Sequence, residues 1–181
     1  MKNLANFLLF QAGWFATVMT AGEGHMWLGP LVVALIVAVH LALFSRPEER
    51  TYELRYILVV GLVGALADTV LRQLGATSYP SSEATWAFAT APPWIVSLWV
   101  LFAILPHHSL GWLRGRAWLA ALLGAIGGPL SYVGGTSFGA VEVGDRPVFT
   151  LGALAVEYAL FTPLLLAFAR ARPRESQRAQ A

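Results

Sequence analysis

The feature that most constrains this chain is a run of twenty residues, Trp86 to Leu105, that contains no charged side chain. A helix needs about 20 residues to cross the ~30 Å hydrocarbon core of a bilayer. Ala117 to Gly135 is equally free of charge, and Met26 to Phe44 and Val148 to Ala169 carry one histidine and one glutamate, respectively. These four segments therefore predict membrane-spanning helices.

Two further segments predict helices although they carry more polar residues. Leu4 to Ala21 includes Gln11, and Tyr52 to Leu74 includes Asp68 and Arg72. The first segment is not a signal peptide on this interpretation, because Gln11 interrupts its apolar run and no cleavage pattern precedes Ala21. The sequence thus predicts an all-α fold, a polytopic membrane bundle of about six transmembrane helices. The predicted helices cover residues 4–21, 26–44, 52–74, 86–105, 117–135 and 148–169.

The composition agrees with this fold class. Apolar residues make up 57% of the chain and charged residues 12%, whereas soluble domains have about 45–50% and about 25%. The absence of cysteine excludes disulfides and thiolate metal sites. The net charge of +2 arises from cations beside apolar segments, so it predicts contact with a lipid bilayer and no nucleic-acid partner.

The cations also predict an orientation. If the N-terminus is cytoplasmic, ten of the twelve Lys and Arg residues lie on the cytoplasmic side, and only Arg72 and Arg146 lie toward the outside. This asymmetry is typical of multi-pass membrane proteins. We therefore expect residues 1–169 to form one transmembrane domain with both termini cytoplasmic, and residues 170–181 to form a disordered basic tail.

Ionisable side chains inside the predicted helices are candidates for function, because each costs at least ~2–3 kcal/mol at the centre of a bilayer. At 1.5 Å per residue, Glu157 lies about 13 Å below the outer boundary, and Asp68 lies about 10 Å below it. Arg72 follows Asp68 by one turn, so an alternative is that the two neutralise each other. The alternative for Glu157 is a carboxyl group that only fixes helix packing.

Two helix interruptions reach a similar depth. Pro92-Pro93 and Gly127-Gly128-Pro129 free backbone carbonyl groups, which are tolerated in a membrane when they are buried in protein or line a polar cavity. We therefore expect an outward-opening cavity near them, although prolines that only bend the helices are the alternative. The predicted ligand-binding residues are Glu157, Asp68, Tyr132, Ser131, Gln11, Arg72, Trp14 and Trp94.

A second polar group lies at the inner side of the predicted bundle. Three imidazoles and a carboxylate could bind zinc or iron. However, metal-binding membrane enzymes usually show repeated H-x-x-H-type spacing on helices, which this chain lacks. We therefore expect a solvated interfacial group, with no metal and no cofactor. Its members are His40, His107, His108, Glu48, Glu49 and Glu53.

Two short stretches are distinctive: Phe10-Gln11-Ala12-Gly13-Trp14-Phe15 and Gly128-Pro129-Leu130-Ser131-Tyr132. Together with Pro93-Trp94 and Ser109-Leu110, they resemble a family of small bacterial inner-membrane proteins catalogued as a domain of unknown function. The likeness extends to about Ala169. It implies a location in the bacterial inner membrane. Genes of this family often neighbour those for cyclopropane-fatty-acid methyltransferase-type enzymes and flavin-dependent oxidases, which implies a link to membrane lipid metabolism.

Three functions follow as hypotheses. The first is an accessory or binding protein for a lipid or another hydrophobic small molecule, acting alone, as a homodimer or with a partner membrane enzyme. The second is a small proton-coupled transporter or permease in which Glu157 titrates. The third is a membrane-embedded lipid-modifying enzyme, for which the sequence identifies no catalytic residue.

The orientation can be tested with reporter fusions. Fusions after Gly75 and Ala140 should report a periplasmic location, and fusions after Glu49, Gly115 and Ala181 a cytoplasmic one, because the cation distribution sets the orientation of short loops. Alkaline phosphatase and fluorescent-protein activities measure the two locations. One inverted loop would contradict the six-helix prediction.

Overall fold

The computed structural model describes residues 2–83, 86–143 and 146–169, and within these ranges the fold is all-α. Its only β-type pairing there is an isolated bridge between Ser78 and Glu142. The predicted tail, 170–181, lies outside the described residues. The α-helices are α1 (Lys2–Gly22), α2 (Leu28–Leu43), α3 (Arg50–Gln73), α4 (Pro80–Glu83), α5 (Pro93–Phe102), α6 (Ala117–Ser137) and α7 (Pro147–Phe168), with 3-10 turns η1 (Pro47–Glu49) and η2 (Gly111–Leu113).

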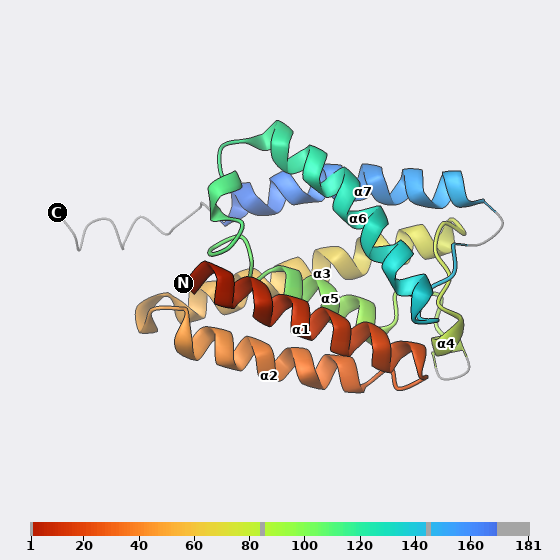
Figure 1. The fold of residues 1–181 in the computed structure, drawn as a ribbon, viewed down its shortest axis with the longest axis horizontal. Coiled ribbons are helices and arrows are strands. Elements are labelled where there is room, and N and C mark those ends of the chain that lie inside the picture. The colour runs from red at the N-terminus through yellow and green to blue at the C-terminus, as the bar shows by residue number, and fades with distance from the viewer. Residues whose placement is uncertain (1, 84–85, 144–145, 170–181) are drawn as a thin grey trace.

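The six apolar helices lie along one long axis and alternate in direction (Figure 1). Helices α1 and α2 form one antiparallel pair and α6 and α7 another, while α5 packs against α1, α2 and α3 in the middle of the bundle. Helix α6 packs mainly on α7. The α6–α7 pair is therefore a unit that is set against the other helices.

Four helical segments are long and apolar enough to cross a membrane: Lys2–Gly22, Pro47–Gln73, Ala117–Ser137 and Pro147–Phe168. Helices α2 and α5 are also apolar but shorter, with 16 and 10 residues. These lengths and compositions are those of a multi-pass membrane protein.

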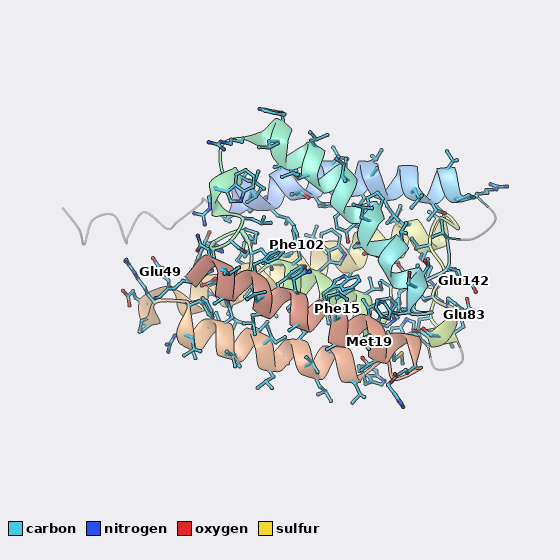
Figure 2. The ribbon with its side chains drawn as sticks, viewed as in Figure 1. Phe15, Met19, Glu49, Glu83, Phe102 and Glu142 are labelled. Atoms are coloured by element: carbon cyan, nitrogen blue, oxygen red, sulfur yellow. The ribbon has the colours of Figure 1, made fainter. Side chains whose placement is uncertain are left out.

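Apolar side chains cover the outside of the bundle. Leu31 and Leu35 of α2 and Leu62 and Leu66 of α3 are all exposed, an arrangement that suits lipid rather than water. Glu49 lies at one end of the molecule, and Glu83 and Glu142 lie at the other (Figure 2). Asp68 of α3 and Glu157 of α7, which lie within the long apolar helices, are buried rather than exposed.

Five of the six predicted helices are present, with ends that differ from the prediction by no more than two residues. The fourth, predicted over 86–105, is wrong in length because α5 covers only Pro93–Phe102. Pro92 is its N-cap residue and Pro93 its first residue. Proline has no backbone N–H group, but the N–H of the first helical residue has no partner within the helix in any case. The two prolines therefore begin the helix rather than interrupt it.

The segment before α5 is not helical, and side chains of α3 bind its backbone. Arg72 donates from Nη1 to the carbonyl oxygen of Thr90 at 2.7 Å, and the amide of Ala91 donates to Thr69 Oγ1 at 3.0 Å. Residues 87–90 are exposed, so these bonds attach the segment to α3 without burying it. Arg72 therefore stabilises an extended segment that the sequence alone placed in a helix.

Two glycines allow α6 and α7 to pack closely. Gly124 and Gly128 are four residues apart, so they lie on the same face of α6. A Cβ atom on Gly124 would lie 2.2 Å from the carbonyl oxygen of Tyr158, and one on Gly128 would lie 2.4 Å from Cγ of the Tyr158 ring. This is the small-residue packing that is typical of membrane helix pairs.

Replacing Gly128 with Ala should destabilise the protein, because the added methyl group meets the Tyr158 ring on the neighbouring helix. We expect a loss of about 1–3 kcal/mol, the usual cost of overpacking. Thermal unfolding in detergent measures it. Gly127→Ala is the matched control, since a Cβ atom there meets nothing within 4 Å and alanine favours helix. Equal melting temperatures for the two variants would contradict this packing.

Candidate functional site

A cavity of about 440 Å³ lies between α1, α5, α6 and α7. This volume falls within the range of about 300–1,000 Å³ that is typical of small-molecule sites. Its walls are mainly aromatic and aliphatic. The aromatic lining residues are Phe7, Phe10, Trp14, Trp94, Trp99, Phe102, Tyr132 and Tyr158.

The cavity walls follow from helix periodicity. On α1, Phe7, Gln11, Trp14 and Val18 recur every three or four residues and line the cavity together, because that spacing places side chains on one helix face. On α6, glycine recurs in the lining, so part of that wall is bare backbone. Large side chains from α1 and α5 thus face a helix that leaves room for a ligand. Phe102 of α5 lies between α1 and the α6–α7 pair (Figure 2).

The cavity is open at the side of the bundle. Phe7 of α1 and Leu123, Gly127 and Leu130 of α6 line the cavity, and all four are also exposed. The opening therefore lies between α1 and α6, among apolar residues. A molecule dissolved in the bilayer could enter there without crossing water.

Asp68 is the buried acidic residue of the cavity wall, with no exposed surface. Its Oδ1 accepts hydrogen bonds from the hydroxyl groups of Tyr132 and, at 3.2 Å, Tyr79, and its Oδ2 accepts one from Trp99 Nε1 at 2.5 Å. A buried carboxyl group needs such donors. Burial and the nearby Asp68 raise the pKa of Tyr79, which precedes α4, well above its ordinary value, so that hydroxyl stays protonated and donates.

Six of the eight predicted ligand-binding residues line this one cavity: Asp68, Tyr132, Ser131, Gln11, Trp14 and Trp94. Trp94 also donates from Nε1 to Ser82 Oγ at 3.0 Å. Ile95, just after the predicted proline interruption, and Gly127 and Gly128 line the same cavity. The lining does not include the prolines themselves.

Arg72 and Glu157 lie elsewhere. The Arg72 guanidinium binds the carbonyl of Thr90 and lies 5.8 Å from the centre of the Tyr79 ring. Among the described residues no ion pair joins it to Asp68, so the predicted alternative of mutual neutralisation is wrong.

Glu157 is buried on α7 and lines a separate, open groove between α3 and α7 with Leu71 and Phe161. Its carboxyl oxygens have no hydrogen-bond partner among the residues that the structure describes. Arg72, Tyr132 and Gln11, the partners that the sequence suggested, make no hydrogen bond with it there.

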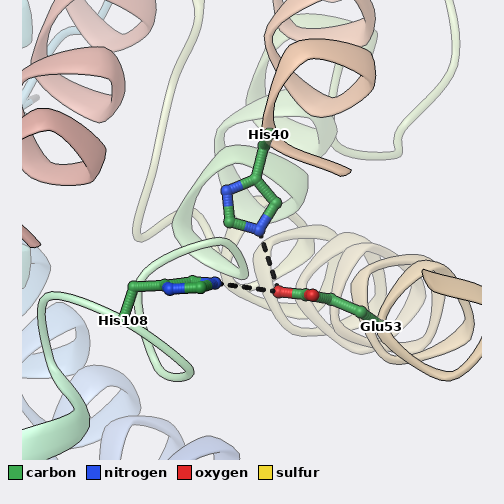
Figure 3. A group of neighbouring side chains, drawn as sticks. All are labelled: His40, Glu53 and His108. Carbon is green, nitrogen blue, oxygen red and sulfur yellow. Dashed lines mark hydrogen bonds and ion pairs between the residues drawn. The ribbon is translucent and has the colours of Figure 1, made fainter. Parts of the chain in front are cut away.

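A second polar cluster lies at the other end of α3 (Figure 3). It consists of His40 from α2, Glu53 from α3 and His108 from the loop between α5 and η2. His40 Nε2 lies 2.8 Å from Glu53 Oε1, and His108 Nε2 lies 3.5 Å from the same oxygen. We refer to these three residues as the His–Glu cluster.

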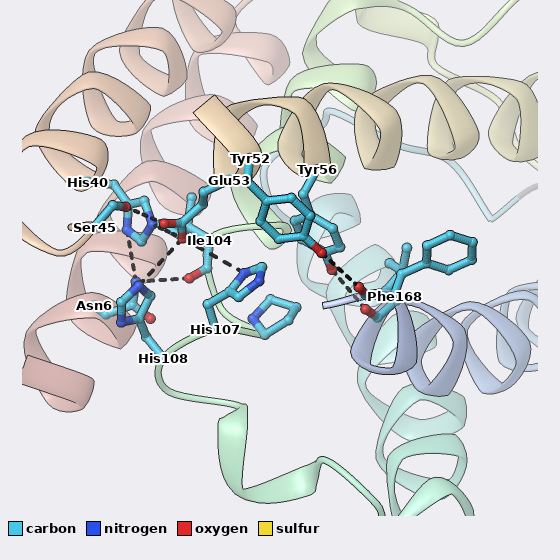
Figure 4. Close-up of polar contacts among 12 residues, drawn as sticks. Asn6, His40, Ser45, Tyr52, Glu53, Tyr56, Ile104, His107, His108 and Phe168 are labelled. Carbon is cyan, nitrogen blue, oxygen red and sulfur yellow. Dashed lines mark hydrogen bonds and ion pairs between the residues drawn. The ribbon is translucent and has the colours of Figure 1, made fainter. Parts of the chain in front are cut away.

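The expectation of a solvated interfacial group is wrong for His40 and Glu53. His40 has no exposed surface and Glu53 is 5% exposed, whereas Glu48 stays at the surface. The cause is the loop after α5, which turns back against the end of α2 and the start of α3 (Figure 4). Sequence reasoning identified the residue types but could not place this loop over them.

Further polar groups hold the His–Glu cluster in position. Ser45 Oγ donates to Glu53 Oε2, and Asn6 Nδ2 lies 3.3 Å from His40 Nδ1. The amide of Asn6 is itself oriented, because Nδ2 donates to the Ile104 carbonyl at 3.1 Å and Oδ1 accepts from Ser109 Oγ at 2.7 Å. Asn6 therefore donates to His40 Nδ1, and His40 carries its proton on Nε2, facing Glu53.

His107 also approaches the cluster, with Nδ1 3.8 Å from Glu53 Oε1. Burial lowers the pKa of His107 to about 4, and the neighbouring Glu53 only partly opposes that shift. The ring is therefore neutral at physiological pH, the form in which imidazole binds metals. Nearby, Tyr56 OH donates to the Leu165 carbonyl at 3.0 Å and joins α3 to α7 (Figure 4).

Removing the Asp68 carboxyl group should destabilise the protein strongly. Asp68→Ala leaves Trp99 without its acceptor, and it leaves the hydroxyls of Tyr79 and Tyr132 to pair with each other, 3.3 Å apart. Each unsatisfied buried donor costs about 1–3 kcal/mol. Tyr132→Phe removes one donor and leaves the others paired, so its effect should be smaller. Melting temperatures in detergent compare the two variants. An Asp68→Ala protein as stable as Tyr132→Phe would rule out this role of the carboxyl group.

Comparison with known proteins gives a family but no activity. No curated protein and no solved structure matches the chain. The model of one family, described as "Protein of unknown function (DUF2878)", matches residues 3–164 and so includes the cavity and the His–Glu cluster. This match confirms the resemblance to a family catalogued as a domain of unknown function. The chain belongs to the DUF2878 family of proteins of unknown function.

Proposed function

We propose that this multi-pass membrane protein lies in the bacterial inner membrane and binds a lipid or another hydrophobic small molecule in the cavity between α1, α5, α6 and α7. The observation that carries the proposal is the aromatic cavity of about 440 Å³, which opens between α1 and α6 among exposed apolar residues. A site of this kind takes its ligand from the hydrocarbon region of a membrane. Aromatic and aliphatic walls of this type bind the apolar part of a ligand.

The polar groups of the cavity indicate the chemistry of the ligand. The lining contains no Lys or Arg among the described residues, so it offers no cation to a phosphate or carboxylate. The oxygens of Asp68 already accept three hydrogen bonds. The Gln11 amide can donate and accept. We therefore infer a largely apolar ligand with one uncharged polar group, such as a hydroxyl, ester or amide.

The other two hypotheses have less support. A proton-coupled permease would need its titrating carboxyl group on the substrate path, whereas Glu157 lines a separate groove between α3 and α7. An enzyme that acts through a serine nucleophile would need a base beside it, whereas Ser131 Oγ donates to the carbonyl of Gly128 at 2.7 Å. Binding is thus the function that the geometry favours.

The proposal predicts that blocking the cavity removes the ligand without unfolding the protein. A leucine at Gly127 should occupy the cavity opening, since this glycine is exposed, lines the cavity and has no atom within 4 Å of an added Cβ. Mass spectrometry of protein purified in mild detergent should detect a defined hydrophobic ligand on the wild type and at most about a tenth as much on Gly127→Leu, as for a loss of ~1.4 kcal/mol of binding energy.

Gly152→Leu is the matched control. This glycine of α7 also has open space around it, but it lines the groove that contains Glu157. It should retain the ligand. Loss of the ligand from Gly152→Leu but not from Gly127→Leu would move the binding site to that groove, and a wild type without a defined ligand would contradict the proposal.

A further inference from the structure

Three imidazole nitrogens approach one carboxyl oxygen where α2 ends and α3 begins. The distances from Glu53 Oε1 are 2.8 Å to His40 Nε2, 3.5 Å to His108 Nε2 and 3.8 Å to His107 Nδ1. The candidate ligand atoms of His40, Glu53 and His108 all lie within 4.8 Å of one another. In a tetrahedral zinc site with bonds of ~2.0–2.1 Å, neighbouring ligand atoms are about 3.3–3.4 Å apart. The cluster is therefore close to the spacing of a metal site.

We propose that His40, Glu53 and His108 bind one divalent transition metal ion, with Zn²⁺ as the ion that fits best. Two imidazoles and one carboxyl group are ligands that Zn²⁺ takes, and three protein ligands leave a fourth position open. His107 Nδ1, which is 3.8 Å from Glu53 Oε1, is a further imidazole nitrogen beside the cluster. This site is separate from the ligand cavity, and the proposal does not depend on what the cavity binds.

The long contact of His108 is the observation that favours a metal over a simple hydrogen-bonded cluster. His108 Nε2 is buried, and its contact with Glu53 Oε1, at 3.5 Å, does not have the geometry of a good hydrogen bond and is shared with His40. Buried polar atoms are almost always well paired, so a buried nitrogen with only a long contact needs an explanation. A metal ion between the three residues would supply a closer partner. Figure 3 shows both rings directed toward the Glu53 carboxyl group.

The surroundings are those of a prearranged site. The ligands come from three different elements, α2, α3 and the loop after α5. Ser45 Oγ binds the second oxygen of Glu53, and the His40 ring stacks on Phe44 with centroids 5.5 Å apart and planes 9° apart. Hydrogen bonds and packing of this kind fix the orientation of metal ligands. Metal binding would join three elements at one end of the bundle.

Metal binding requires one proton to move. His40 now carries its proton on Nε2 and accepts from Asn6 at Nδ1. To bind a metal through Nε2, the ring must carry the proton on Nδ1 instead, and the Asn6 amide must turn so that Oδ1 accepts it. Ser109 Oγ, which now donates to Oδ1, can then accept from the Asn6 amide nitrogen, because a hydroxyl does both, whereas the bond from the Asn6 amide to the Ile104 carbonyl is lost. His40 keeps one proton throughout.

The test is a zinc titration of the full chain, purified in detergent without a histidine tag and stripped with a chelator. Calorimetry against a competing chelator should show one Zn²⁺ per chain. His108→Asn and Glu53→Gln should weaken binding more than about 100-fold, beyond the 10–100-fold that is typical of losing a surrounding hydrogen bond. His25→Asn is the control, because His25 is exposed in the turn between α1 and α2, and it should bind zinc like the wild type.

Cobalt supplies a readout that folding alone would not change. Co²⁺ added to the stripped wild type and to His25→Asn should give the visible absorption of a tetrahedral site, and His108→Asn, checked by circular dichroism, should lack it. A wild type that binds no metal at one equivalent would overturn the proposal. So would unchanged zinc affinity in both His108→Asn and Glu53→Gln, or a loss of binding in His25→Asn.

Discussion

The arrangement of this protein depends on the hydrogen bonds of the Asp68 carboxyl group. Asp68 lies on α3, and its three donors come from α5, from α6 and from the segment before α4. Helix α6 otherwise packs mainly on α7, so this contact is one of the few polar links between that pair and the other helices. In a medium without water such a link is strong, because a separated donor finds no other partner. The α6–α7 pair is linked to the other helices at Asp68 and does not pack against α1 and α5 along its whole length. The cavity lies in the space that remains between them.

Helix α3 carries the polar contacts at both of its ends. Near its start, the Glu53 carboxyl group contacts His40 and His108, and the Tyr56 hydroxyl donates to a carbonyl group of α7. Near its end, Asp68 joins the cavity wall and Arg72 binds the extended segment before α5. Between them, exposed leucines face outward and Gly64 lies directly under the Trp99 ring, where an added Cβ would be 2.0 Å from Cγ. One helix thus has a lipid face, a packing face and two polar ends.

The sequence predicted five helices well because each is a long apolar run whose length the bilayer sets. It failed at 86–105 because side chains of another helix hold the residues before α5 in a non-helical conformation, and no local pattern records that Arg72 and Thr69 bind them. The same limit explains the histidines. His40 and Glu53 are 13 residues apart, but His108 reaches them through a loop whose path depends on where α5 ends. Depth along the helices predicted Asp68 for the cavity, whereas the direction in which Glu157 points from α7 depended on packing.

The cavity extends from the Asp68 carboxyl group toward the loop that carries the histidines of the His–Glu cluster. Its lining runs from Asp68 and Val141 at one end to Leu105, Leu110 and Leu113 at the other, the last three belonging to the region that carries His107 and His108. A ligand would therefore lie along the bundle, with apolar walls over most of its length. Leu105 and Leu110 flank the two histidines in the chain. The loop that would hold a metal ion at His108 is therefore the loop that lines this end of the cavity.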